Sequence, residues 1–187
     1  RFLINFWEVP RKDFVWIYEE TSPNNTIEYT AKRLLLRWEN EKGGLNELKK
    51  LKIASIQGRE VWQKKGVAIN LTANLNASLY LGSVFDMNLG VILPNEEKKL
   101  MAIWAYCSSH QFYLDVRKLD QQLKLTTATL VKVPFDIEYW QKIAEEKYPN
   151  GLPKPCSDDA TQWLFHGHPI KAENPLQVTV ARLLGYR

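Results

Sequence analysis

Cysteine is scarce in this sequence. Its 187 residues include only Cys107 and Cys156, which lie far apart and form no Cys-x-x-Cys pair. Neither a disulfide framework nor a zinc ribbon can be built from them. Such sparing use of cysteine fits a reducing compartment, so we expect a cytoplasmic location.

Long apolar runs and a leader are missing as well. No segment approaches the roughly eighteen consecutive apolar residues of a transmembrane helix, and no basic-then-apolar stretch opens the chain. We therefore expect no membrane partner and no export. Because the sequence begins at Arg1 and stops at Arg187, directly after a helix-like segment, we interpret it as a piece of a longer protein.

Familiar catalytic and cofactor motifs are not present either. The sequence has no glycine-rich phosphate loop, no Gly-x-Ser-x-Gly elbow and no Asn-Pro-Pro-aromatic tetrapeptide. His166 and His168 form a close pair but lack the further ligands of a tetrahedral metal site. Cys107 falls on an apolar helix face and suits a buried small residue better than a nucleophile. We expect no catalytic residue, metal or cofactor in this chain.

Charge is present but unevenly distributed. The formal net charge is +4, and residues 1–65 hold 13 basic against 9 acidic residues, whereas residues 66–187 hold 12 of each. Between residues 32 and 65 the ratio reaches 10 to 4, in a stretch that also carries Trp38 and Trp62. This pattern fits a phosphate-contacting surface. An ordinary solvated basic face explains it equally well.

The first half of the sequence predicts strands and loops. Alternating aromatic and β-branched residues indicate a strand over 14–20, and residues 26–37 fit a second strand, with a short helix as the alternative. Leucines at 45, 48 and 51 predict a helix over 43–52. Residues 66–93 then read as a run of short strands punctuated by glycines and ended by a proline.

The second half predicts helices with recognisable ends. We expect Asn95 to cap one helix, Ser108 and Ser109 to restart another, and Asp136 to cap a third that breaks at 148–151. Residues 129–133 predict a strand ended by a proline. A short helix should follow Asp158 or Asp159, and a last helix should run from 174–175 to the glycine at 185.

These elements predict an α+β fold. A mixed or antiparallel sheet with loops should form the N-terminal part, and the C-terminal helices should pack against it. We expect one domain over 1–135 and a helical extension over 136–187. The segment 70–78 is rich in amides and hydroxyls, which suit contacts with base edges and phosphates. A plain surface loop is the alternative.

Several stretches together resemble the C-terminal region of large bacterial restriction-modification methylases. They are FDMN at 85–88, AIWAYCSS at 102–109, LDQQL at 119–123, ATLVKVPFD at 128–136, KYPNGLP at 147–153, DATQWLFHGHP at 159–169, PLQV at 175–178 and ARLLGYR at 181–187. The resemblance covers roughly residues 59–187, and the start, with RF at 1–2 and FWE at 6–8, more loosely.

This resemblance implies the target-recognition region of a Type II adenine-specific DNA methyltransferase. In that family another domain holds S-adenosylmethionine and the catalytic tetrapeptide, and a nuclease is often joined to it. The expected partners are double-stranded DNA and the methyltransferase domain of the parent chain. A non-catalytic scaffold or subunit-docking module is the competing hypothesis. The candidate DNA-binding residues are Arg59, Lys64, Lys65, Asn70, Thr72, Asn74, Asn76 and Lys124.

Overall fold

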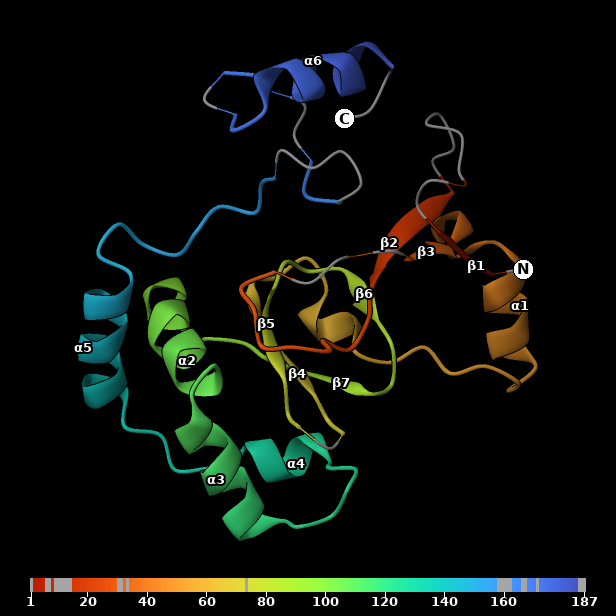
Figure 1. Ribbon diagram of the computed structural model, residues 1–187. Helices are drawn as coiled ribbons and strands as arrows, with labels where there is room; N and C mark the ends of the chain where they lie inside the picture. Colours follow the sequence, from red (N-terminus) through yellow and green to blue (C-terminus); the bar gives the residue numbers. More distant parts are fainter. Residues whose placement is uncertain are drawn as a thin grey trace.

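The architecture is α+β, with two small sheets and six α-helices among the residues described (Figure 1). The computed structural model describes residues 2–5, 8, 15–29, 32, 34–72, 74–157, 163–165, 168–170 and 172–184. The strands are β1 (Leu3–Asn5), β2 (Trp16–Glu20), β3 (Leu34–Arg37), β4 (Gly66–Asn70), β5 (Ala77–Tyr80), β6 (Val84–Phe85) and β7 (Leu89–Ile92). The helices are α1 (Gly44–Lys50), α2 (Leu100–Cys107), α3 (His110–Leu119), α4 (Thr127–Leu130), α5 (Ile137–Lys147) and α6 (Pro175–Leu183), with 3₁₀ turns at Glu39–Glu41, Arg59–Val61 and Glu97–Lys99.

Strand β4 is the centre of the fold. It lies between β5 and β7 and pairs antiparallel with both, and its first four residues are buried. Val67 and Ile69 belong to the main core, whereas Ala68 packs in a second, smaller cluster with Tyr80. A strand buried on both faces needs a continuous apolar run rather than an alternating one, which the sequence Gly-Val-Ala-Ile supplies.

Two helices form a layer on the Val67 face of this sheet. Helix α2 packs on β4, and α5 packs on α2 (Figure 1). Tyr106 contacts several aromatic side chains in this layer. Its ring centroid lies 5.4 Å from that of Phe112 and 5.0 Å from that of Trp140. Trp104 Nε1 donates to the Tyr148 hydroxyl at 2.7 Å, which joins α2 to the end of α5. The layer therefore holds α5 and Tyr148 against the sheet.

The second sheet has the order β1-β3-β2-β6, with β6 parallel to β2 and the other pairs antiparallel. It is joined to the first sheet through the segment after β2. There Ile27 N donates to Ala77 O at 3.2 Å, and Leu79 N donates to Glu28 O at 2.9 Å. These bonds satisfy the outer edge of β5, so the edge strand is covered rather than exposed.

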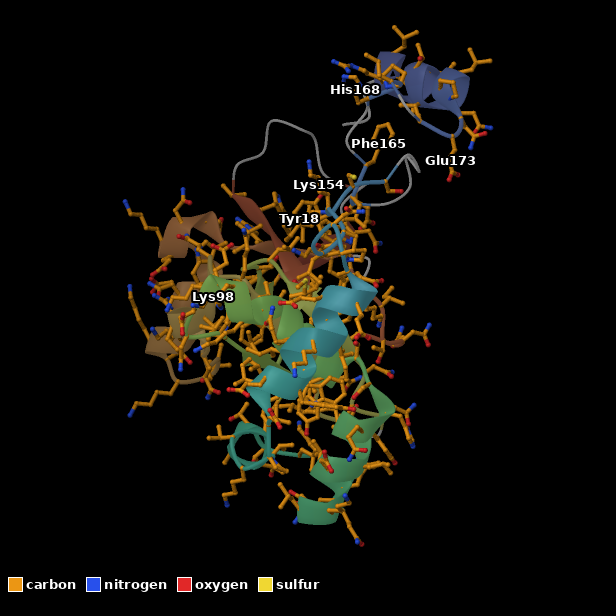
Figure 2. All side chains as sticks on the ribbon, turned by 90° about the vertical axis from the view of Figure 1, so that its left-hand side faces the viewer. Tyr18, Lys98, Lys154, Phe165, His168 and Glu173 are labelled. Carbon is orange, nitrogen blue, oxygen red and sulfur yellow. The ribbon has the colours of Figure 1, made fainter. Side chains whose placement is uncertain are left out.

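The last part of the chain leaves the main body. Figure 1 shows α6 apart from the two sheets, and Figure 2 shows Phe165 between the main body and α6, with His168 beside that helix. Phe165 is buried, and Ser157 pairs with it in an isolated parallel bridge. Because Trp140 and Ala144 of α5 belong to the main core, the expected extension over 136–187 shares its packing with the region before it.

The helix ends follow the sequence signals closely. Ser109 Oγ accepts from Phe112 N at 3.3 Å, and Asp136 Oδ1 accepts from the amides of Glu138 and Tyr139, as predicted. Asn95, however, caps no helix, because a 3₁₀ turn over Glu97–Lys99 precedes α2. The helix predicted after Asp158 or Asp159 and the glycine at 185 lie outside the described residues.

The strand predicted over 129–133 is wrong. Residues Thr127–Leu130 form the helix α4 instead. Thr129 N donates to Thr126 O, and Thr129 Oγ1 donates to Asp120 Oδ2 at 3.1 Å. Leu130 packs against the main core, whereas Val131 is 86% exposed. The β-branched pattern was outweighed by this local hydrogen bonding and by the packing of a single leucine.

Replacing Trp140 tests whether α5 and the sheet unfold together. Trp140→Ala should lower the free energy of unfolding by about 3–5 kcal/mol, because the variant leaves a large cavity in the core. Lys142→Ala, at an exposed residue of the same helix, should change it by less than about 0.5 kcal/mol. Urea unfolding followed by circular dichroism measures both. Two separate transitions, with only one of them shifted by Trp140→Ala, would instead show that α5 belongs to an independent unit.

Candidate nucleic-acid interface

The eight candidate residues fall into two groups at opposite ends of β4. Arg59, Lys64 and Lys65 precede its first residue, and the other five lie at or beyond its last residue, Asn70. At about 3.3 Å per residue, the strand separates the two ends by roughly 13 Å. The structure therefore brings the candidates together as two sites rather than one.

The first group is partly neutralised by carboxylates. Arg59 Nη1 lies 2.7 Å from Glu41 Oε2, and Lys65 Nζ lies 2.7 Å from Glu97 Oε1. The hydrogen bond and charge of Lys65 hold the pKa of Glu97 below its ordinary value. Lys64 is exposed and makes no ion pair with a described residue. With Lys65, it borders a pocket of about 380 Å³ whose apolar side is Leu93 and Pro94.

Arg59 also joins two tryptophans. Its guanidinium carbon lies 5.5 Å from the Trp38 ring centroid and 5.7 Å from that of Trp62. The two indoles meet edge to face at 5.4 Å. Cation–π contacts of this kind help to hold the guanidinium in place against the indole rings. Trp38 and Trp62 are half-buried and contact each other and Arg59, so part of their ring surface is already occupied.

In the second group, Asn70 and Thr72 are engaged within the chain. Asn70 Nδ2 donates to Pro23 O at 3.1 Å. Its Oδ1 accepts from the amide and the hydroxyl of Thr72 at 2.9 and 2.6 Å. These bonds give Asn70 a structural role, fixing the turn after β4 against the segment that follows β2. Base contact by either residue stays a prediction.

Asn76, Lys124 and Asn74 differ in how freely they face solvent. Asn76 Nδ2 donates to Asn24 O at 2.6 Å, and Lys124 Nζ donates to Asn88 Oδ1 at 3.1 Å. Asn74 is exposed, and its side chain forms no hydrogen bond with another described residue. It borders a pocket of about 290 Å³ beside the start of α3. Asn74 and Lys124 are therefore the exposed members of this group.

The first group lies in a stretch of the sequence that carries further basic residues besides Lys64 and Lys65. Residues 42–65, called here the basic segment, contain seven basic and two acidic residues, a net charge of +5. Lys42, Lys49, Lys52 and Lys64 are all exposed, and none of them forms an ion pair with a described residue. The segment thus presents unneutralised positive charge to solvent.

A buried charged pair, which no pattern in the sequence indicated, lies elsewhere in the fold. Glu20 and Lys32 are 1% and 5% exposed, and Lys32 Nζ lies 3.4 Å from Glu20 Oε2. Lys32 also donates to Ser83 Oγ at 2.5 Å and lies 4.4 Å from the Trp163 ring centroid. Burial raises the pKa of Glu20 and lowers that of Lys32, and their mutual attraction opposes both shifts. The sequence shows only a charge at the end of a strand, which is ordinarily exposed.

Both members of this pair are buried, and Lys32 also contacts Trp163 of the C-terminal segment, so breaking the pair should be costly. Glu20→Gln should lower the free energy of unfolding by about 3–5 kcal/mol, because it leaves the Lys32 charge buried without its partner. The exposed counterpart Glu47→Gln, which breaks the surface pair with Lys50, should cost less than about 1 kcal/mol. Urea denaturation at neutral pH measures the difference.

The pH dependence of the Glu20→Gln variant has a defined sign. A lysine whose folded pKa is lowered binds fewer protons in the folded than in the unfolded state, so stability rises with pH. The variant should therefore regain stability between the lowered Lys32 pKa and its ordinary value near 10.5. A loss that stays constant across this range would show that Lys32 is not the charge being left unpaired.

The described residues offer no evident metal site. Among them, no cluster of three or more His, Cys, Asp and Glu side chains could hold a metal ion. Cys107 is buried, as predicted, and burial raises the pKa of its thiol. His166 lies outside the described residues. His168 Nδ1 accepts from the Ile170 amide at 3.3 Å.

No family model matches the chain, and no characterised protein matches it either. In the described part of the chain, none of the helices combines the length and apolar character needed to cross a bilayer. The resemblance to restriction-modification methylases thus stays an expectation. A proposal for function rests on that resemblance together with the geometry and charge of the two sites.

Proposed function

We propose that this chain is the DNA target-recognition region of a bacterial restriction-modification adenine methyltransferase. A catalytic domain elsewhere in the parent protein would supply S-adenosylmethionine and transfer the methyl group. The observation that carries the proposal is the basic segment, with its net charge of +5 and its exposed lysines that lack carboxylate partners among the described residues. Unneutralised lysines are what a surface needs to contact DNA phosphates.

The two sites would have different roles in DNA binding. Lys64, Lys65 and Arg59 would contact phosphates and fix the register of the duplex, because cations contact the backbone without reading sequence. Asn74 would face base edges, since its amide presents both a donor and an acceptor. Lys124, the one cation of this second site, could donate to the acceptors of a guanine edge. Asn70, Thr72 and Asn76 would shape this second site through their internal hydrogen bonds, and would read bases only by exchanging them.

Salt-dependent duplex binding tests the role of the basic segment. The triple variant Lys49→Ala, Lys52→Ala, Lys64→Ala should bind a randomised duplex pool more weakly at low salt. Its slope of log affinity against log salt should also become shallower, by up to about 0.9 for each phosphate that the variant no longer neutralises. Fluorescence anisotropy across a salt series measures both quantities.

The matched control is Lys132→Ala, Lys142→Ala, Lys154→Ala. These three lysines are also exposed and form no ion pair with a described residue, so the net charge changes equally. The control should keep the parent slope. If both variants lose affinity equally, the basic segment contributes only through the overall charge of the chain. If the parent chain binds no duplex at any salt, the proposal is overturned.

A docking role for the same region is the second candidate, and α6 favours it. Leu176, Val180, Leu183 and Leu184 are 77%, 47%, 82% and 73% exposed, at positions that share one helical face. On this alternative the methyltransferase domain of the parent chain covers α6, and the basic segment only keeps the surface soluble. The salt series separates the two, because a pure docking module shows no duplex binding.

A further inference from the structure

The pocket beside Asn74 combines an apolar floor with a polar rim. It has a volume of about 290 Å³. Leu75, Cys107 and Phe112 form its floor and are 2–3% exposed. Asn74 and Thr26 line the rim from the loop side. The rim is completed by α3, which contributes residues 110 and 113.

The turn that borders this pocket has an unusual backbone. Leu75 adopts a left-handed conformation with φ of 53°, which is rare for a bulky residue. Its amide donates to Thr72 O at 3.1 Å and closes a tight turn. This turn places the Leu75 side chain in the core and leaves Asn74 exposed at the rim. Strained residues of this kind concentrate at functional sites.

Polar groups at the rim are available to a ligand. The side chains of Asn74, His110 and Tyr113 form no hydrogen bond with another described residue. The His110 and Tyr113 rings lie nearly parallel, at 16° with centroids 5.9 Å apart, and are stacked on each other. Arg117 lies 5.6 Å from the Tyr113 ring centroid, one turn further along α3.

The pocket lining carries no acidic, lysine or arginine side chain among the described residues, which favours a neutral ligand. A phosphate would find no lysine or arginine, and a metal ion would find no carboxylate. A neutral ligand with an apolar face and hydrogen-bonding edges matches both the floor and the rim.

We propose that this pocket binds a single unstacked nucleobase. An asparagine amide can pair with the edge of a purine through a donor and an acceptor, and aromatic rings stack on bases freed from a duplex. The volume of about 290 Å³ is large enough for one base. The inference rests on the proposed function, because DNA is then the source of the base. A free nucleoside offers the same chemistry from a second source.

The experiment uses the full chain and three probes: a DNA hairpin with one unpaired adenosine bulged from its stem, the same hairpin fully paired, and free adenosine. The bulged hairpin should bind about tenfold more tightly than the paired one. Asn74→Ala should abolish this preference, because the base loses its partner amide. Asn95→Ala, at an exposed asparagine away from the pocket, should retain it. The His110 imidazole resonances should shift when the bulged hairpin or adenosine is added.

The outcomes separate this inference from the proposed function. Salt-sensitive binding of both hairpins with equal affinity, and unmoved His110 resonances, would overturn the pocket and leave DNA recognition standing. Adenosine binding that Asn74→Ala removes, without binding of either hairpin, would support a nucleoside pocket and overturn DNA recognition. No binding of any probe would overturn both.

Discussion

Everything in this fold depends on burying β4 on both of its faces. Val67 and Ile69 are buried in the same core cluster as residues of α2 and α5. Ala68 is buried on the opposite face, in the cluster around Tyr80. Gly66 has no room for even a methyl group, because a Cβ there would lie 2.4 Å from Ile92 O. Neighbouring elements must therefore cover the strand closely, and only its two ends are left to carry polar side chains.

This constraint explains why the functional candidates form two groups. Polar residues cannot lie along a strand whose faces are both apolar, so they gather before Gly66 and after Ile69. At the first end, long cations project from turns. At the second end, short amides are close enough to the backbone to bond with it, as Asn70 does with Pro23. The two ends consequently differ in chemistry: one is charged and exposed, and the other is neutral and largely satisfied.

Local signals in the sequence predicted much of the fold. Asp136 and Ser109 cap their helices because a cap needs only neighbouring amides, and the short strands expected between 66 and 93 are present as β4 to β7. The burial of β4 on both faces was not predicted. Long-range contacts could not be predicted in this way. Leu130 turns a β-branched segment into a helix by packing against the core, and no local pattern in the sequence shows that contact.

The candidate site shows the same limit. Composition pointed to the basic stretch between residues 32 and 65 and to the amide-rich segment 70–78, but it could not show that Asn76 bonds to Asn24 O, 52 positions earlier. Nor could it show that Glu20 and Lys32 are both buried, with Lys32 against the ring of Trp163, 131 positions later in the chain. The pocket beside Asn74 likewise depends on the meeting of α3 with a turn from the sheet, which spacing alone does not reveal.

The carboxylates of Glu41 and Glu97 give the basic group a consequence of its own. Each already occupies a cation that a phosphate would need, at 2.7 Å. If the chain binds DNA as proposed, a phosphate at Arg59 or Lys65 would compete with a carboxylate that remains nearby. Such a contact would neutralise the phosphate only partly, so it would release fewer condensed ions than a lone lysine. The first site would therefore bind DNA of any sequence only weakly. Contacts at the second site would then determine which sequence is bound tightly.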